Sequence, residues 1–341
     1  MELGGSGRAG NAVVGDGFGV RDFDLDRVEI QAHHGLAFMK KIIFFIVVAA
    51  VSVIGLIFYR QPVKISANPI FSSSEIATSS LRVIFFAVGQ GDSTLIITPQ
   101  DKTILVDGGP DDKVLSKLGK YLPLNQKKID YMILTHPHAD HLDGLVSVLK
   151  KYDVGEIYYS GVAHTTYAFM EWLKLIKEEN IVMKIIDKPQ VLELDSRVKL
   201  DFLYPNKDLS EIEIKGQEES KYGKNNNLNN VSILFKLIYG KTKFLFTGDA
   251  ETPVEKELLK TQADLRADVL KVAHHGSHSS TGDKFLAAVQ PKMAVISSGT
   301  GNDFGHPHLR TLRRLERYGV KIYRTDELGD VEMKSDGENI E

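Results

Sequence analysis

The amino-acid sequence predicts an α/β layered sandwich, and three observations lead to that prediction. Short apolar runs bounded by turn residues recur from Leu81 onward and have the length of strands, as in Val83–Val88 and Tyr131–Thr135. Segments with helical periodicity, such as Tyr167–Glu179 and His308–Tyr318, are interspersed among these runs. Clusters of histidine and aspartate follow directly after several of the runs. Many strands with helices between them are typical of layered α/β domains rather than of all-β proteins.

The remaining elements follow from the same two patterns. Strands are expected where short apolar runs lie between turn residues: Val83–Val88, Thr94–Thr98, Thr103–Val106, Tyr131–Thr135, Ile157–Ser160, Val198–Leu203, Val231–Tyr239, Lys243–Thr247, Val269–Ala273 and Ala294–Ser297. Helices are expected where apolar residues recur every three or four positions: Tyr167–Glu179, Val254–Leu259, Phe285–Val289 and His308–Tyr318.

The composition limits the possible functions. A chain of 341 residues with 43% apolar and 26% charged residues can form one large or two modest domains with a real core. The net charge of −3 gives no sign of a strongly basic nucleic-acid-binding surface. The chain has no cysteine, which excludes disulfides and thiolate metal sites. Any metal must therefore be held by His, Asp, Glu, Asn or backbone oxygen.

A membrane segment is predicted near the N-terminus. Ile42 to Tyr59 is apolar except for Ser52 and Gly55, and it approaches the roughly 20 residues that a helix needs to cross a bilayer. Lys40 and Lys41 precede it and favour a cytoplasmic N-terminus. We therefore expect a single-pass signal anchor in the cell membrane, with the folded domain outside the cytoplasm.

These patterns divide the chain into five parts. Residues 1–38 are glycine-rich and lack periodicity, which predicts either a disordered extension or a start assigned too early. Residues 39–60 form the expected anchor, and the serine-rich residues 61–80 form a linker. The folded domain is expected over residues 81–335, and residues 336–341 are expected to be a tail.

A cluster of metal-binding residue types follows the apolar strand Tyr131–Leu134. His136, His138, Asp140 and His141 lie within six residues directly after it. Alternating side chains at a strand end can bring the first two histidines to one metal ion, and the following turn can direct Asp140 and His141 toward a second. Neutral imidazole and carboxylate are ligands that zinc, manganese or iron accept without thiolates. The segment therefore predicts a metal site.

Three later segments also place polar residues after apolar strands. Asp249 follows one strand, and its carboxylate could bridge two ions about 3.5–4 Å apart. His274, His275 and His278 follow the next strand, and Asn302–His308 follows the one after it. Eight of the 11 histidines fall in residues 135–141 and in the last two of these segments, which indicates one convergent site.

The motifs resemble those of the metallo-β-lactamase superfamily, and within it the extracytoplasmic hydrolase domain of ComEC-type DNA-uptake proteins. The resemblance covers roughly Leu81 to Met333, and the order of the motifs makes it specific. It is carried by AVGQGDSTLI at 87–96, LVDGG at 105–109, THPHADH at 135–141, FTGD at 246–249, KVAHHGSHSS at 271–280 and NDFGHPH at 302–308.

The resemblance implies an αββα sandwich with a metal site at its edge. His275 competes with His274 for one ligand role, because sequence does not separate adjacent histidines. Asp92 and Asp107 are expected to orient ligand histidines. Two divalent ions, Zn²⁺ or Mn²⁺, would be held by His136 and His138 at the first position, by Asp140, His141 and His274 at the second, and by Asp249 between them.

Two departures from the family pattern affect this prediction. Many members have a further metal-binding histidine where this chain reads Asn227–Ser232, so the first ion is expected to be weakly held, replaced or absent. His164 comes too early in the chain to substitute easily, and a core or helix-capping role is expected for it. Ala87 stands where the family usually has Asp, which puts full activity or metal preference in question.

Catalytic roles are predicted for Asp140, His275 and His306. A divalent ion lowers the pKa of bound water toward about 7, and Asp140 is placed to accept or orient the proton. His306 would stabilise charge that develops on the attacked group. His275 is included as the alternative to His274. Substrate contacts are expected from Asn230, Ser232, Ser277, Arg313 and Arg317.

The last predicted helix carries a basic stripe. Leu309, Leu312 and Leu315 are expected on its core-facing side. A stripe of this kind could track phosphates, although a solvated helix face is the commoner explanation. The stripe consists of Arg310, Arg313, Arg314 and Arg317.

These expectations predict a membrane-anchored, metal-dependent hydrolase that acts as a phosphodiesterase or nuclease on DNA, most simply single-stranded DNA. One alternative is a hydrolase of small phosphoesters, such as phosphocholine on cell-surface polymers. The other is an impaired surface binding protein on the same fold, which the Ala87 departure favours slightly and the intact histidine motifs oppose.

Overall fold

The computed structural model describes residues 80–210, 212 and 228–341. The predicted extension, the membrane segment at 42–59 and all of the linker except residue 80 lie outside the described residues. Among the helices of the described part, none has the length and apolar character needed to cross a membrane.

Two seven-stranded sheets form the middle of the described structure. The first sheet runs in the order β14 (Val331–Ser335), β1 (Leu81–Phe85), β2 (Thr94–Ile97), β3 (Thr103–Val106), β4 (Lys128–Leu134), β5 (Asp153–Tyr159) and β6 (Val182–Ile185). The second runs in the order β13 (Lys321–Arg324), β12 (Met293–Ile296), β11 (Val269–Lys271), β10 (Thr242–Phe246), β9 (Leu234–Tyr239), β8 (Val198–Tyr204) and β7 (Gln190–Glu193).

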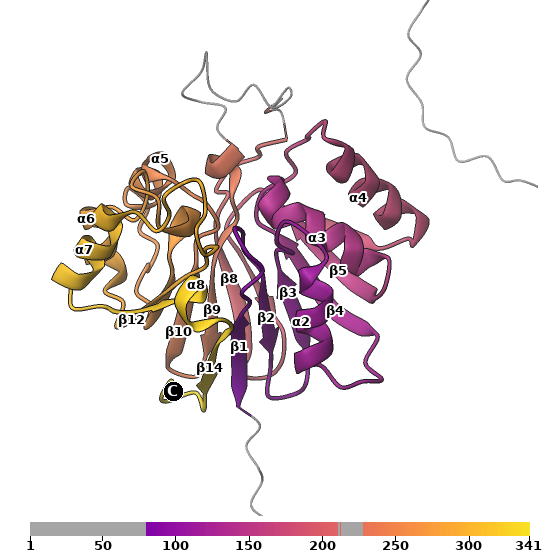
Figure 1. Cartoon of the computed structure of the whole chain (residues 1–341), viewed down its shortest axis with the longest axis horizontal. Coiled ribbons are helices and arrows are strands. Elements are labelled where there is room, and N and C mark those ends of the chain that lie inside the picture. The colour runs from indigo at the N-terminus through magenta and orange to yellow at the C-terminus, as the bar shows by residue number, and fades with distance from the viewer. Residues whose placement is uncertain (1–79, 211, 213–227) are drawn as a thin grey trace, which may run out of the picture. The chain divides into compact units, whose positions relative to one another are not determined.

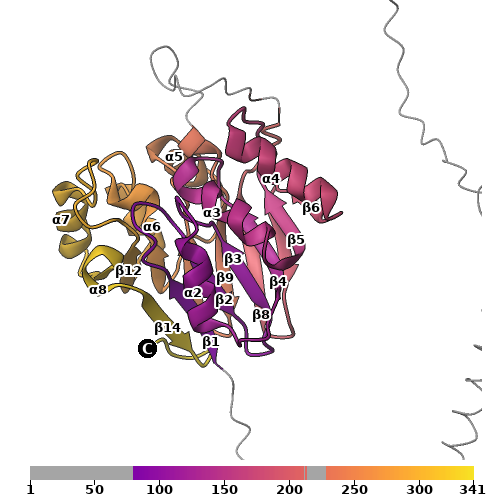
Figure 2. The same ribbon diagram turned by 45° about the vertical axis from the view of Figure 1, so that its right-hand side comes forward.

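Helices cover the outer face of each sheet, so the predicted α/β class with two sheets is confirmed (Figure 1). In Figure 2, α2 and α3 lie in front of the first sheet, with β8 and β9 of the second sheet behind it. The first sheet carries α2 (Lys113–Tyr121), α3 (Ala139–Leu149) and α4 (Tyr167–Glu178). The second carries α5 (Thr252–Leu258), α6 (Asp283–Val289) and α7 (Leu309–Arg317), and the short α8 (Thr325–Leu328) precedes β14.

Alternation along the strands explains why the sheets stack. Val83 and Phe85 of β1 belong to the core between the sheets, whereas Ile84 packs with the helices outside. Both faces of the strand are therefore apolar, as expected for a strand buried on both sides. Phe246 of β10 joins the two sheets, because its ring lies 5.9 Å from Phe85 and 4.7 Å from Phe235 of its own sheet.

The expected elements are present with shifted ends, and several further elements were not predicted. The first strand ends at Phe85 rather than at Val88. Residues 336–341, expected to be a tail, fold back on β14, where Glu341 exchanges two backbone hydrogen bonds of 2.9 Å with Lys334. Strands β6, β7, β13 and β14 and helices α2, α3 and α8 have no counterpart among the predicted elements.

Ala87, the second departure, is held by the C-terminal part of the chain. Its backbone N–H donates to Oδ1 of Asp330 at 2.9 Å. The same carboxylate accepts from Lys117 at 2.6 Å and from Lys120 at 3.0 Å. Burial raises the pKa of Asp330, but these donors outweigh burial and lower the pKa to about 2. The loop that precedes β2 is thus tied to helix α2 and to the start of β14.

Replacing Asp330 with asparagine should lower the free energy of unfolding by about 1–2 kcal/mol at neutral pH. The folded-state pKa lies below the unfolded value, so this stabilisation is present above about pH 4 and is lost as the pH falls toward 2. The stabilities of the wild type and of Asp330→Asn, measured by urea unfolding, should therefore converge as the pH falls from about 4 to about 2. The exposed Asp153→Asn serves as control, and a difference that stays constant with pH would contradict this account.

Candidate metal centre

The residues of the candidate site directly follow strands of both sheets. Strand β4 ends at Leu134, and the first turn of α3 begins at Ala139, so the histidine-rich segment lies between a strand and a helix. Asp249 follows β10, and His275 follows β11. Strands β10 and β11 are parallel neighbours, which places their following residues at the same edge of the sheet. The site therefore forms where the two sheets meet at one edge.

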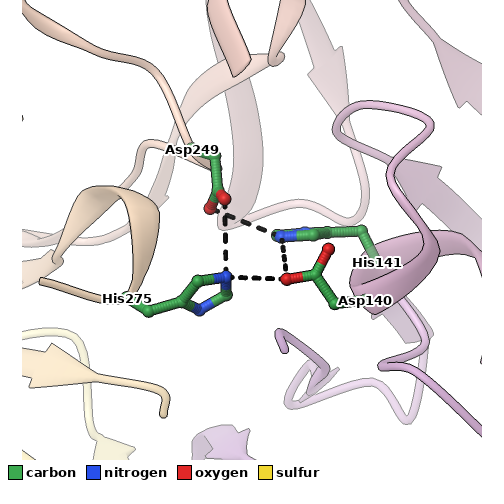
Figure 3. Close-up of side chains that lie close together, drawn as sticks. All are labelled: Asp140, His141, Asp249 and His275. Carbon is green, nitrogen blue, oxygen red and sulfur yellow. Dashed lines mark hydrogen bonds and ion pairs between the residues drawn. The ribbon is translucent and has the colours of Figure 1, made fainter. Parts of the chain in front are cut away.

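Four side chains gather there: Asp140, His141, Asp249 and His275 (Figure 3). One ligand atom from each lies within 4.8 Å of the others. Nε2 of His275 is 3.0 Å from Oδ2 of Asp140 and 3.4 Å from Oδ2 of Asp249. Nε2 of His141 is 3.4 Å from Oδ1 of Asp249. The Asp140 side chain is 31% exposed while the other three are buried, so Asp140 forms the accessible side of the group.

The far nitrogen of each buried histidine contacts another carboxylate. Nδ1 of His141 lies 2.9 Å from Asp107, which also accepts from the backbone and hydroxyl of Thr135 at 2.8 Å each. Nδ1 of His275 lies 3.3 Å from Asp92 and 3.0 Å from the carbonyl of Ser297. These contacts fix both rings with Nε2 toward Asp249.

Charge holds the group together. Burial alone lowers the pKa of His141 and His275, but the carboxylates around them, Asp249 foremost, outweigh burial and raise each pKa well above its usual range. Burial would raise the pKa of Asp249, yet the two histidines keep it well below its usual range. The carboxylates thus attract positive charge, which a divalent ion would supply in place of protons.

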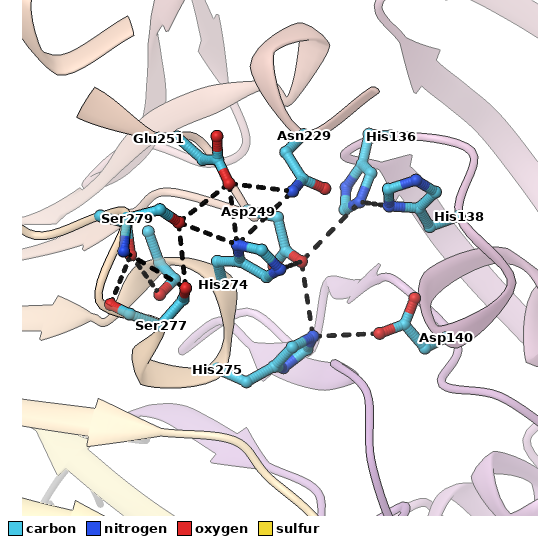
Figure 4. A network of polar contacts seen from close by, with 12 residues as sticks. His136, His138, Asp140, Asn229, Asp249, Glu251, His274, His275, Ser277 and Ser279 are labelled. Carbon is cyan, nitrogen blue, oxygen red and sulfur yellow. Dashed lines mark hydrogen bonds and ion pairs between the residues drawn. The ribbon is translucent and has the colours of Figure 1, made fainter. Parts of the chain in front are cut away.

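His136 and His138 lie on the other side of Asp249 (Figure 4). Nε2 of His136 is 2.9 Å from Nδ1 of His138 and 3.9 Å from Oδ2 of Asp249. Burial, followed by the nearby charges of His141 and His138, lowers the pKa of His136 well below its usual value. Its ring is therefore neutral at neutral pH, which is the form that binds metals.

The structure places His275, rather than His274, beside Asp140 and His141. Both histidines have left-handed backbone conformations, with φ of 50° at His274 and 52° at His275. This backbone directs the two adjacent rings to different partners, and His274 lies next to Glu251, with Nδ1 3.2 Å from Oε1. The structure thus brings His275, the competing candidate for this ligand role, into the group with Asp140 and His141, and His274 is not part of that group.

Three of the predicted substrate-binding residues support the backbone instead. Ser232 is fully buried and its hydroxyl accepts from the N–H of Asp249 at 3.0 Å. Asn230 accepts from the N–H of Glu251 at 3.1 Å. Ser277 is buried, and its hydroxyl lies 3.0 Å from that of Ser279. The hydroxyl and amide oxygens of these residues are thus engaged with backbone N–H groups of neighbouring loops.

The basic stripe on α7 is only partly as predicted. Arg313 is exposed, whereas Arg317 pairs with Asp283 at 3.0 Å. Arg314 donates to the carbonyl of Thr281 at 2.8 Å and so ties α7 to the loop before α6. Leu309, expected in the core, is 56% exposed because it occupies the first position of the helix. The stripe therefore offers fewer free guanidinium groups than the spacing suggested.

His306 lies beside His274 and His275. Its ring centroid is 5.4 Å from that of His274, and burial, followed by the charges of His274 and His275, lowers the pKa of His306 to about 4. Phe304, which sequence reasoning missed, is 70% exposed and its ring is stacked 6.0 Å from that of His306. An aromatic residue within a polar motif was the available signal.

The sequence analysis missed two further functional candidates, Lys271 and Glu251, and it expected a core or capping role for the more distant His164. Lys271 forms a buried pair with Asp92 at 2.7 Å, and Glu251 contacts His274. The signal for each was its position, two or three residues from a predicted ligand. His164 lies at the start of α4, where its Nδ1 is 3.1 Å from the hydroxyl of the capping residue Thr166.

The residues fit a divalent ion. Nε2 of His141 and Oδ1 of Asp249 are buried and face each other at 3.4 Å, and neither atom makes a hydrogen bond within the described residues. A buried polar atom left without a partner costs about 1–3 kcal/mol, which a bound cation would remove. Imidazole nitrogen and carboxylate oxygen are also the donors that zinc, manganese and iron accept.

Comparison with known proteins agrees with this geometry. A model described as the metallo-beta-lactamase superfamily matches residues 87–300, which is more than half of the chain. The chain belongs to the metallo-β-lactamase superfamily.

Within that superfamily the chain is similar to ComEC-type competence proteins, as predicted. It is 28% identical over 264 residues to ComE operon protein 3 of Bacillus subtilis (strain 168), and the matched region covers 72% of this chain and 32% of that protein. It is 28% identical over 261 residues to competence protein ComA of Neisseria gonorrhoeae, covering 74% and 32%. A shorter match, 34% identical over 68 residues, is to exodeoxyribonuclease YycJ of Bacillus anthracis, covering 20% and 26%. The chain spans about a third of the length of these two competence proteins.

Proposed function

We propose that this chain is a metal-dependent phosphodiesterase that cleaves DNA, with single-stranded DNA as its preferred substrate. The observation that carries the proposal is the group of Asp140, His141, Asp249 and His275, whose ligand atoms converge within 4.8 Å. The similarity to competence proteins and to a protein named as an exodeoxyribonuclease supports DNA as the substrate.

Divalent ions held by this group would polarise a phosphoester and lower the pKa of water. Residues of the chain itself would supply the proton acceptor and a hydrogen-bond donor. Asp140 is the accessible carboxylate of the group, and although burial raises its pKa, His141 and His275 lower it below its usual value. Asp140 is therefore ionised at neutral pH and placed to accept a proton at Oδ2. The neutral ring of His306 faces the same histidines and can donate to charge that develops on a phosphate oxygen.

A substrate panel tests this function. The full chain, loaded with Mn²⁺ or Zn²⁺, is assayed on single-stranded DNA, duplex DNA and a phosphocholine ester. We expect cleavage of single-stranded DNA, and we expect chelation of the metal to abolish it. Asp140→Ala should reduce the cleavage rate at least about a hundredfold. Asp143→Ala, one helical turn further along α3, should leave the rate unchanged. Cleavage of the phosphocholine ester alone would replace this function with the small-phosphoester alternative. Metal binding without hydrolysis of any substrate would favour a binding protein.

Phe304 should contribute to recognition of a nucleobase. An exposed aromatic ring next to a phosphoester site can stack on a base, and such stacking is worth about 1–3 kcal/mol. Phe304→Ala should therefore raise KM for a single-stranded oligonucleotide about tenfold and leave kcat nearly unchanged. Steady-state kinetics measure both constants. Leu309→Ala, which removes another exposed apolar side chain of the same segment, is the matched control, and an equal effect of both variants would contradict base stacking.

We also propose that residues 42–59 anchor the chain in the cell membrane with the domain outside the cytoplasm. The apolar composition of that segment supports this placement. Expression of the full chain followed by alkaline carbonate extraction tests it. An anchored protein stays in the membrane pellet and becomes protease-sensitive in intact spheroplasts. Release of the protein by carbonate would contradict the anchor.

A further inference from the structure

His274 has no place in the four-residue group, yet its ring is oriented toward the same carboxylate. Nε2 of His274 is 4.0 Å from Oδ2 of Asp249, and Nε2 of His136 lies 3.9 Å from that same oxygen on the other side. Nδ1 of His138 lies 2.9 Å from Nε2 of His136, so three histidines outside the four-residue group lie in this part of the site (Figure 4).

The far side of the His274 ring is held in the same way as those of the two buried ligand candidates. Nδ1 of His274 lies 3.2 Å from Glu251, just as Nδ1 of His141 faces Asp107 and Nδ1 of His275 faces Asp92. In metal sites, a ligand histidine almost always donates its second ring N–H to a carboxylate or carbonyl, which fixes the ring and increases its basicity. All three rings follow this pattern, and all three point Nε2 at Asp249.

Glu251 is itself fixed, so it can hold the ring. Its carboxylate accepts from the hydroxyl of Ser279 at 2.9 Å, and its backbone N–H donates to Asn230 at 3.1 Å. These contacts fix the position of the Glu251 carboxylate beside Nδ1 of His274.

The backbone at these two histidines also indicates a function. Non-glycine residues in the left-handed region cost about 1–2 kcal/mol each, and two in succession are rare. His274 and His275 both adopt this conformation, and their rings lie at 67° to each other. The strained turn lets adjacent residues send Nε2 to two sides of one carboxylate, and strain of this kind persists where the surroundings support a functional geometry.

We propose that His274 is a ligand of the first metal ion, together with His136, His138 and Asp249, and that Glu251 is the residue that positions it. A tetrahedral ion takes four such donors. The histidine that the sequence lacks between Asn227 and Ser232 is thereby replaced from another loop. The inference rests on the metal-binding part of the proposed function and is independent of the DNA substrate.

Metal content of the purified full chain tests this assignment. After chelation and reloading with Co²⁺, wild type should hold two equivalents per chain by elemental analysis, and His274→Ala should hold one. The Co²⁺ absorption bands should lose the component from the first position. His278→Ala, an exposed histidine in the same segment, should keep both equivalents. Glu251→Gln should weaken the first position by about 10–100-fold in a Co²⁺ titration while higher Co²⁺ restores two equivalents.

The assignment would be overturned if His274→Ala still bound two equivalents of Co²⁺ with unchanged affinity. It would also be overturned if the wild type bound only one equivalent and His274→Ala retained that one. If His274→Ala does not fold, judged by circular dichroism of the metal-free protein, the Glu251→Gln titration decides the question, and unchanged affinity there would overturn the proposal. Metal loss in His274→Ala from a protein that cleaves no DNA would refute the nuclease but support this inference.

Discussion

Replacing Asp249 with alanine should reduce the proposed metal-dependent phosphodiesterase activity at least about a thousandfold. Asp249 is 2% exposed and its two oxygens face the Nε2 atoms of four histidines, at 3.4–4.0 Å. Both candidate metal positions therefore share this carboxylate. Its loss removes a ligand from each position and the negative charge that holds the histidines together.

Measurement of bound metal and of kcat in parallel separates the possible outcomes. We expect Asp249→Ala to lose most of its metal and its activity together, whereas Asp303→Ala, an exposed aspartate before His306, keeps both. Asp249→Asn retains the shape and removes the charge, so it should lie between them in metal affinity. Full metal content with full activity in Asp249→Ala would show that the metal centre lies elsewhere.

The second large effect concerns stability rather than chemistry. Lys271 and Asp92 form an ion pair of 2.7 Å whose side chains are 3% and 6% exposed. Burial raises the pKa of Asp92, but Lys271 and His275 outweigh it and lower the pKa to about 2. Removing Lys271 leaves the buried Asp92 with His275, at 3.3 Å, as its remaining cationic neighbour, and breaking a buried pair in this way costs about 3–5 kcal/mol. Lys271→Met should therefore destabilise the metal-free protein by that amount.

Urea unfolding of the metal-free protein measures this effect. Lys292→Met is the matched control, since Lys292 pairs with Asp268 at 2.9 Å but is 78% exposed, and such pairs contribute about 0–1 kcal/mol. The double variant Lys271→Met with Asp92→Asn should recover part of the loss, because no unpaired charge remains. A cost below about 1 kcal/mol for Lys271→Met would mean that water reaches Asp92.

Local patterns were sufficient to predict the fold class and most central strands. Strands buried on both faces, such as β2 and β3, are almost wholly apolar runs that are visible directly in the sequence. The edge strands β6 and β7 were missed because each has only four residues and none of these residues is buried. Helix α3 was missed because its first turn is the metal motif itself, which reads as a loop.

The part of the candidate site whose residues are neighbours in sequence could be predicted. The part in which the backbone conformation decides where a side chain points could not. Residues 136–141 were identified from spacing alone. The separate destinations of His274 and His275 depend on two left-handed residues, which no side-chain pattern reveals. Ser232 and Ser277 were expected at the substrate and are buried, because their burial depends on strands that are distant in sequence.

The position of the site between the two sheets has a consequence for the life of the protein in the cell. His141 comes from the helix that follows β4 in one sheet, and Asp249 and His275 come from loops of the other. A divalent ion bound to all three would cross-link the sheets without a covalent bond. Binding to the folded chain alone adds RT ln(1 + [M]/Kd) to the free energy of unfolding, about 4 kcal/mol at a thousand times Kd. The lifetime of the protein would then follow the supply of the metal, so that starvation for the ion would remove the folded protein by proteolysis as well as empty its metal site.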